Sequence, residues 1–176
     1  LDGVIHLGAI SSTTASDGDA VMENNFRLSL NLLDWCTAAK VPFIYASSAA
    51  TYGDGEQGFT DNWQLPELRK LKPMNLYGWS KHLFDLALID RVAKKQKLPP
   101  QWAGLKFFNV FGPHQAADHA YAAVVPVFVS AALAGRPIPI HGDGTQSRDF
   151  TYVDTVTAVV ADALRRRVTH PEPVNL

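Results

Sequence analysis

Three short apolar runs, separated by longer segments that include helical periodicity, constrain the fold of this chain more than any other feature. The runs cover residues 3–9, 42–46 and 105–110. Two parallel strands need a crossover of a dozen or more residues, usually a helix, whereas antiparallel strands can be joined by short turns. The lengths of the separating segments therefore predict an α/β fold with a parallel sheet.

The spacing of apolar residues also predicts the helices that cover this sheet. We expect helices over residues 21–40, 76–95, 124–134 and 154–167, and one more strand from residue 173. From His114 onward the segments are short. They are expected to form small added elements rather than another full doubly wound unit.

Charge and cysteine content exclude several classes of protein. Lys plus Arg is 16 and Asp plus Glu is 17, a balance that leaves no electrostatic footprint for nucleic acid or an anionic membrane. The single cysteine, Cys36, excludes an intramolecular disulfide framework and favours a reducing cytoplasm. No apolar run approaches the roughly 20 residues that cross a bilayer. The sequence opens almost directly on an apolar strand without a Met, so we expect it to be part of a longer protein.

Residues 53–58 match the spacing G-x-G-x-x-G. A dinucleotide-binding loop of this kind opens directly into a helix whose amides bind pyrophosphate. Here no helical periodicity follows, and the carboxylates of Asp54 and Glu56 would repel phosphate. We interpret the segment as a surface turn.

Tyr77 and Lys81 form the strongest chemical signal. They lie four residues apart near the start of a predicted helix, which places both side chains on one face. A free tyrosine titrates near about pH 10, and a nearby ammonium stabilises the phenolate and lowers that pKa. Ser48 follows the second apolar run, where its hydroxyl can hold a substrate oxygen. Together the three predict an acid/base site, although Tyr-x-x-x-Lys alone is common on amphipathic helices.

The chain resembles the extended short-chain dehydrogenase/reductases, specifically the NAD(P)-dependent nucleotide-sugar epimerases and dehydratases. The resemblance covers nearly the whole chain and rests on residues 6–9, 24–25, 47–53, 77–81, 108–113 and 142–150. It implies a Rossmann-like parallel sheet whose N-terminal part is absent. Residues 1–113 would be the C-terminal portion of the NAD(P)-binding domain. Residues 114–176 would be part of a small α+β substrate-binding region with returning Rossmann elements. The family's phosphate-binding glycine loop would lie upstream.

The resemblance also implies the ligands and their contacts. The cofactor is NAD or NADP, expected at Leu7, Gly8, Ala9, Asn24, Ser47, Tyr77, Lys81, Phe108 and Val110. The substrate is a nucleotide-diphosphate sugar, expected at Ser48, Asn109, Tyr121, His141 and Arg148. Transient oxidation to a keto sugar and return of hydride to its other face would epimerise one carbon. Because ligands bind beyond the carboxyl ends of parallel strands, Ser48 and Asn109 should lie at one edge of the sheet.

The two halves resemble epimerases with different substrates. One set of segments is similar to ADP-L-glycero-D-manno-heptose 6-epimerases: residues 11–18, 24–25, 45–53 and 102–109. A second set is similar to UDP-hexose 4-epimerases: residues 121–126 and 140–144. Asp118 falls where heptose epimerases carry a Lys implicated as a second acid/base, so the two-base arrangement is not expected here. Residues 114–150 are predicted to choose the substrate. The longer match favours the heptose, and a UDP-hexose is the alternative.

Two further readings concern metals and activity. His114, Asp118 and His119 are more simply solvated loop residues than ligands, so no metal is expected. A truncated, inactive fragment or a nucleotide-sugar-binding homologue is the alternative to an enzyme. In the full-length protein a homo-oligomer is expected.

Overall fold

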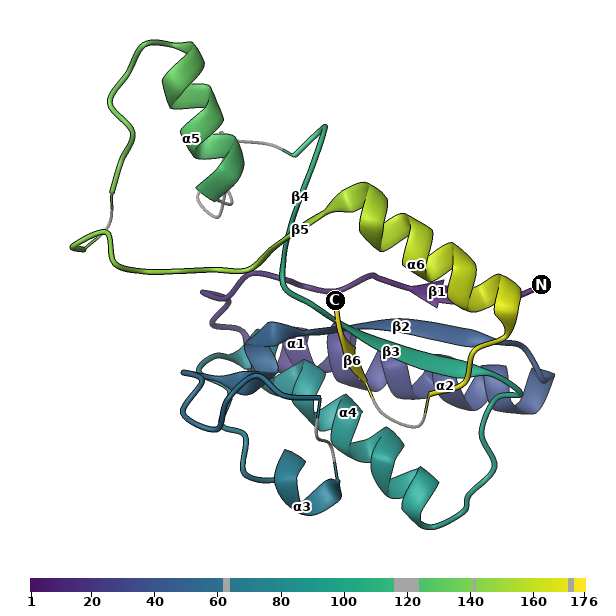
Figure 1. Cartoon of the computed structure of the whole chain (residues 1–176). Helices are drawn as coiled ribbons and strands as arrows, with labels where there is room; N and C mark the ends of the chain where they lie inside the picture. Colours follow the sequence, from purple (N-terminus) through teal and green to yellow (C-terminus); the bar gives the residue numbers. More distant parts are fainter. Residues whose placement is uncertain (62–63, 116–123, 141, 171–172) are drawn as a thin grey trace.

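A four-stranded parallel sheet lies at the centre of the computed structural model, which describes residues 1–61, 64–115, 124–140, 142–170 and 173–176 (Figure 1). The strands run in the order β1-β2-β3-β6, with bounds Val4–His6, Phe43–Ser48, Trp102–Phe107 and Val174–Asn175. Each neighbouring pair is parallel. All six residues of β2 are buried, as expected for a central strand covered on both faces. The structure confirms the predicted parallel α/β fold.

Helices cover both faces of the sheet (Figure 1). On one face, α2 (Leu28–Ala39) and α4 (Leu76–Ala93) pack against β2, forming a core of Leu33, Cys36, Phe43, Tyr45, Phe84 and Leu88. On the other face, α6 (Val153–Arg166) encloses a core of Ile44, Ala103, Leu105, Val156 and Val160. The short α3 (Leu65–Leu68) packs beside α4. Among the described helices, none is both long and apolar enough to cross a membrane.

The helix predicted over residues 21–40 is not regular. It consists of α1 (Gly18–Val21), a π-helical segment η1 (Met22–Arg27) and then α2. π-helical turns are rare and frequently occur at functional sites. Asn25, the buried residue of η1, binds backbone groups of the loop after β1. The apolar spacing does not reveal this departure, because the side chain that the π-helical segment buries is polar.

The apolar run over residues 105–110 also divides into two strands. β3 ends at Phe107, and β4 (Asn109–Phe111) pairs in parallel with β5 (Phe150–Tyr152) in a separate two-stranded sheet. The backbone N–H of Asn109 donates to the carbonyl of Asp149 at 3.3 Å, which starts this second pairing. Helix α5 (Val124–Leu133) extends away from the main sheet on this side of the molecule (Figure 1). α6 and β6 then return to the main sheet.

Candidate active site at the carboxyl edge of the sheet

Ser48 is the last residue of β2 and begins a 3₁₀ turn, η2 (Ala49–Tyr52). Its backbone is extended, and its Oγ accepts a hydrogen bond from the backbone N–H of Ala50 at 3.1 Å. The side chain therefore caps the turn and stays at the carboxyl end of the strand. β3 ends beside it, because Ser48 is opposite Phe107 in the sheet register. Phe108 and Asn109 follow directly, so the predicted meeting of these strand ends at one edge is confirmed.

Helix α4 brings Tyr77 and Lys81 to the same edge. The helix begins after Asn75, whose Oδ1 accepts a hydrogen bond from the backbone N–H of Gly78 at 2.8 Å, an N-cap. Tyr77 makes a side-chain hydrogen bond with Ser48. Lys81 lies one turn further along the helix and is only 4% exposed. Its Nζ donates to the carbonyl of Ala46, in β2, at 2.9 Å. The structure thus brings together the three residues that the sequence predicts to be catalytic.

Gly78 allows this close approach. A Cβ at this position would lie 2.7 Å from the carbonyl oxygen of Ala50 and 3.0 Å from the Cβ of Pro73. A larger residue would push the start of α4 away from the turn after Ser48. Its role was not predicted, because the sequence does not show which backbone the helix start approaches.

The pKa values of the two α4 residues shift in opposite directions. Burial raises the pKa of Tyr77; the hydrogen bond with Ser48 opposes this rise, and the charge of Asp85 adds to it. Burial lowers the pKa of Lys81 to about 8, although the charge of Asp85 opposes the change. The expectation that Lys81 lowers the pKa of Tyr77 is therefore wrong for this structure. Burial dominates at Tyr77, and the Lys81 ammonium bonds to a backbone carbonyl.

The lowered pKa of Lys81 predicts a pH dependence of stability. Between about pH 8 and 10.5, the folded protein holds Lys81 neutral while the unfolded chain still binds the proton. Stability attributable to this group therefore rises with pH across that window, by up to about 1.4 kcal/mol per pH unit. We expect the free energy of unfolding of the wild type, measured in urea, to rise relative to Lys81→Met from pH 8 to 10. Parallel pH profiles of the two proteins would contradict a lowered pKa.

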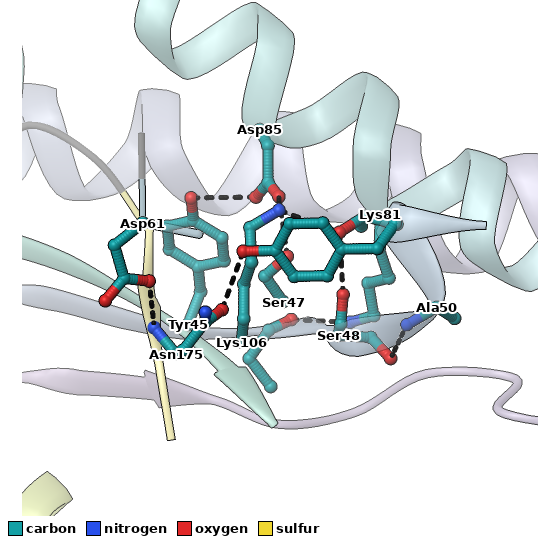
Figure 2. A network of polar contacts seen from close by, with 12 residues as sticks. Tyr45, Ser47, Ser48, Ala50, Asp61, Lys81, Asp85, Lys106 and Asn175 are labelled. Atoms are coloured by element: carbon teal, nitrogen blue, oxygen red, sulfur yellow. Dashed lines mark hydrogen bonds and ion pairs between the residues drawn. The ribbon is translucent and has the colours of Figure 1, made fainter. Parts of the chain in front are cut away.

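A buried polar network lies beside the Ser48 turn (Figure 2). Asp85, one turn beyond Lys81 on α4, accepts hydrogen bonds from Tyr45 Oη at 3.0 Å and from Ser47 Oγ at 2.6 Å. Its Oδ2 lies 3.4 Å from Lys106 Nζ, and both side chains are fully buried. The sequence interpretation missed this pair. The available signal was a lysine within an apolar run, since charged side chains are almost never fully buried unless paired.

Asn25 organises the loop that follows β1. Its amide group bonds to both backbone groups of Ile10, at 2.8 Å to the N–H and 3.0 Å to the carbonyl, and its Nδ2 also lies 3.0 Å from Ser80 Oγ. The predicted Asn24 is exposed, and its side chain donates to the carbonyl of Ala20. Asn25, rather than Asn24, therefore connects this loop to α4.

Comparison with known proteins identifies the family. The model of the NAD dependent epimerase/dehydratase family matches residues 1–176. The chain belongs to this family. It is 40% identical over 167 residues to the ADP-L-glycero-D-manno-heptose-6-epimerase of Fusobacterium nucleatum, a match that covers 91% of this chain and 49% of that protein. For the enzyme of that name from Nitratidesulfovibrio vulgaris the identity is 41%, over 91% of this chain and 50% of the relative. The chain thus spans about half the length of these curated relatives.

Solved structures of epimerases share the fold. The UDP-N-acetylglucosamine 4-epimerase of Methanobrevibacter ruminantium M1 superposes with a TM-score of 0.83 at 29% identity, over 99% of this chain and 54% of that one. The ADP-L-glycero-D-manno-heptose-6-epimerase of Helicobacter pylori gives a TM-score of 0.82 at 28% identity, over 99% and 52%. The two substrate classes suggested by the sequence thus both occur among the similar structures.

NAD is the cofactor of this family, and the predicted contacts Leu7 and Gly8 are open in this structure. Leu7 is 52% exposed directly after β1, and a Cβ added to Gly8 would meet nothing within 4 Å. An apolar side chain and a bare backbone facing open space suit a flat aromatic ring system. The buried ammonium of Lys81 lies at the same edge. These features agree with a dinucleotide beyond the carboxyl ends of the strands.

The remaining predicted ligand contacts differ in whether their side chains already have partners within the protein. Ser47 Oγ donates a hydrogen bond to Asp85 Oδ2. Phe108 packs beside Tyr52, and Val110 contacts the core beneath α6. The exposed Asn109 donates from Nδ2 to the carbonyl of Asp149 at 2.8 Å. Arg148 is exposed, with Nη1 bonded to the adjacent Ser147 carbonyl. Tyr121, His141, Asp118 and His119 lie outside the described residues.

Proposed function

We propose that the complete protein is a nucleotide-sugar epimerase of the ADP-L-glycero-D-manno-heptose 6-epimerase type. The observation that carries this proposal is the meeting of Ser48, at the end of β2, with Tyr77 and Lys81 of α4 at the carboxyl edge of the sheet. It places an acid/base phenol beside a hydroxyl that can hold the same sugar oxygen. Membership of the NAD dependent family and about 40% identity to heptose epimerases support the reaction class and the sugar.

The side chains have separate tasks in this reaction. Ser48 Oγ binds the sugar oxygen that becomes a carbonyl, and Tyr77 Oη removes the proton from that oxygen and later returns it. NAD, when bound, supplies the hydride acceptor and donor. Lys81 and Leu7 hold the cofactor, and Gly8 leaves room for it. Because burial raises the pKa of Tyr77, the phenol needs further stabilisation to act as a base. The Ser48 hydrogen bond contributes this stabilisation.

The sugar is proposed to bind between the strand ends and residues 114–150. Asn109 precedes this segment, Arg148 lies near its end, and both residues are exposed. The guanidinium of Arg148 suits a diphosphate because its planar donors can bind two oxygens. We further propose that the protein acts in the cytoplasm, in keeping with the single cysteine of this chain, and that the complete protein is a homo-oligomer.

The test supplies two sugars in parallel to the protein expressed from its complete reading frame. NMR follows the configuration of the carbons in ADP-heptose and UDP-glucose. We expect inversion at C6 of the heptose, which would also show that Asp118 does not exclude this chemistry. Inversion only at C4 of the hexose would support the second candidate, a UDP-hexose 4-epimerase, which the superposition with a UDP-sugar 4-epimerase favours. Inversion of neither sugar, without co-purified NAD, would contradict the proposal and favour a fragment or binding homologue.

A further inference from the structure

A line of hydrogen bonds connects the buried ion pair to the backbone of Ser48. Lys106 Nζ donates to Thr51 Oγ1 at 2.7 Å, and Thr51 Oγ1 donates to the carbonyl of Ser48 at 2.8 Å. Lys106 and Thr51 are both 0% exposed. Figure 2 shows Lys106 reaching from β3 towards Asp85 and the end of β2. The interaction is therefore shielded from water along its whole length.

The Thr51 hydroxyl has a fixed direction in this line. A hydroxyl has one proton to donate, and here it is committed to the Ser48 carbonyl because the lysine ammonium can only donate. Threonine is also restricted at χ1 by its branched Cβ. The hydroxyl therefore ties the third residue of η2 back to the residue that begins the turn, and so limits how the Ser48 backbone can rotate.

Lys106 is itself held from several sides. Its ammonium lies 3.4 Å from Asp85 Oδ2 and 4.6 Å from the centre of the Tyr52 ring. In the sheet it is opposite Ser47, the residue before Ser48. A buried ion pair is weak evidence for stability, since apolar residues of similar volume can be equally stabilising. The Lys106–Asp85 pair has a more specific effect than stabilisation, because it fixes the orientation of the turn that begins at Ser48.

We propose that Lys106 and Thr51 are positioning residues that hold Ser48 Oγ in place against Tyr77. This inference rests on the proposed function, in which Ser48 and Tyr77 contact the reacting oxygen. Neither Lys106 nor Thr51 touches the substrate. They act by fixing the turn from which the Ser48 hydroxyl is presented, and a small displacement of a reacting group can lower turnover strongly.

The test compares Thr51→Val with Thr51→Ser in the protein expressed from its complete reading frame. Valine keeps the branched shape and removes the hydroxyl, whereas serine keeps the hydroxyl. The titration of Tyr77 is followed by NMR of tyrosines labelled with ¹³C at Cζ. The Tyr77→Phe variant identifies the Tyr77 signal. The Ser48→Ala variant shows the pKa of Tyr77 when the Ser48 contact is lost. We expect Thr51→Val to raise the pKa of Tyr77 towards its value in Ser48→Ala, and Thr51→Ser to keep the wild-type pKa.

Turnover provides a second readout. We expect kcat to fall about 10- to 100-fold in Thr51→Val, with an unchanged KM for the sugar, and to recover in Thr51→Ser. A folded Thr51→Val protein with wild-type Tyr77 titration and kcat would overturn the proposal. Thr51→Cys, a weaker donor of similar size, provides the same comparison should Thr51→Val fail to fold. The NMR titration needs no turnover, so failure of the proposed function with both sugars is distinguishable from failure of this positioning role.

Discussion

Replacing Tyr77 with Phe is expected to lower turnover by about 10²-fold or more while the nucleotide sugar still binds. The phenylalanine ring keeps the packing of Tyr77 at the start of α4 but has no hydroxyl to exchange a proton with the sugar. It also loses the hydrogen bond with Ser48. Steady-state kinetics and calorimetric titration with the sugar, both on the protein expressed from its complete reading frame, would separate the loss of turnover from binding.

Trp79→Phe provides a matched control on the same helix. Trp79 is 40% exposed, so this change alters an aromatic side chain two residues away without removing an acid/base group. We expect turnover within about twofold of the wild type, the small effect usual for exposed positions. Near-normal turnover in Tyr77→Phe would contradict the proposed role of Tyr77. His114, which is exposed near the small sheet, would then be the next base to test.

Replacing Lys106 with Met is expected to destabilise the fold by about 3–5 kcal/mol, because it leaves the Asp85 carboxylate buried without a counter-charge. Methionine is similar in length but cannot donate to Asp85 or Thr51. Both charged side chains are 0% exposed, so solvent cannot replace the lost partner. Urea unfolding monitored by circular dichroism would measure the change in the free energy of unfolding.

The double variant Lys106→Met/Asp85→Asn tests the origin of this loss. Asparagine removes the second charge and can still accept a hydrogen bond from Tyr45 or Ser47. We expect it to recover a large part of the stability lost in Lys106→Met. If the double variant were less stable than the single variant by the full effect of Asp85→Asn alone, the two residues would be energetically independent and the ion pair would not explain the loss.

Much of the architecture follows from the spacing of apolar residues. The run over residues 42–46 became the buried strand β2, and the segment over residues 76–95 became α4. A strand covered on both faces needs a continuous apolar run, which makes it visible in the sequence. The same spacing did not reveal where β3 ends, because Phe107 of β3, Phe108 between the strands and Val110 of β4 are all apolar.

The catalytic candidates were visible for a different reason. Tyr77 and Lys81 are four residues apart on one helix, so local geometry alone places them on one face. Their association with Ser48 was predicted because Ser48 follows a buried apolar run, and the structure explains the close approach by the glycine at position 78. The direction of the Tyr77 pKa shift could not be predicted from the sequence. It depends on how much water the fold excludes and on the distance to Asp85, neither of which is a local property.

By itself, the sequence determined the parallel α/β fold, the helix face that carries Tyr77 and Lys81, and the family. These depend on periodicity and on residues close together in the chain. Only the tertiary structure decided that Asp85 and Lys106 form a buried pair, that Asn25 rather than Asn24 holds the loop after β1, and that Thr51 connects Lys106 to Ser48. Such contacts join residues from different strands and helices. They form because burial leaves each polar group dependent on the partners that folding brings within hydrogen-bond distance.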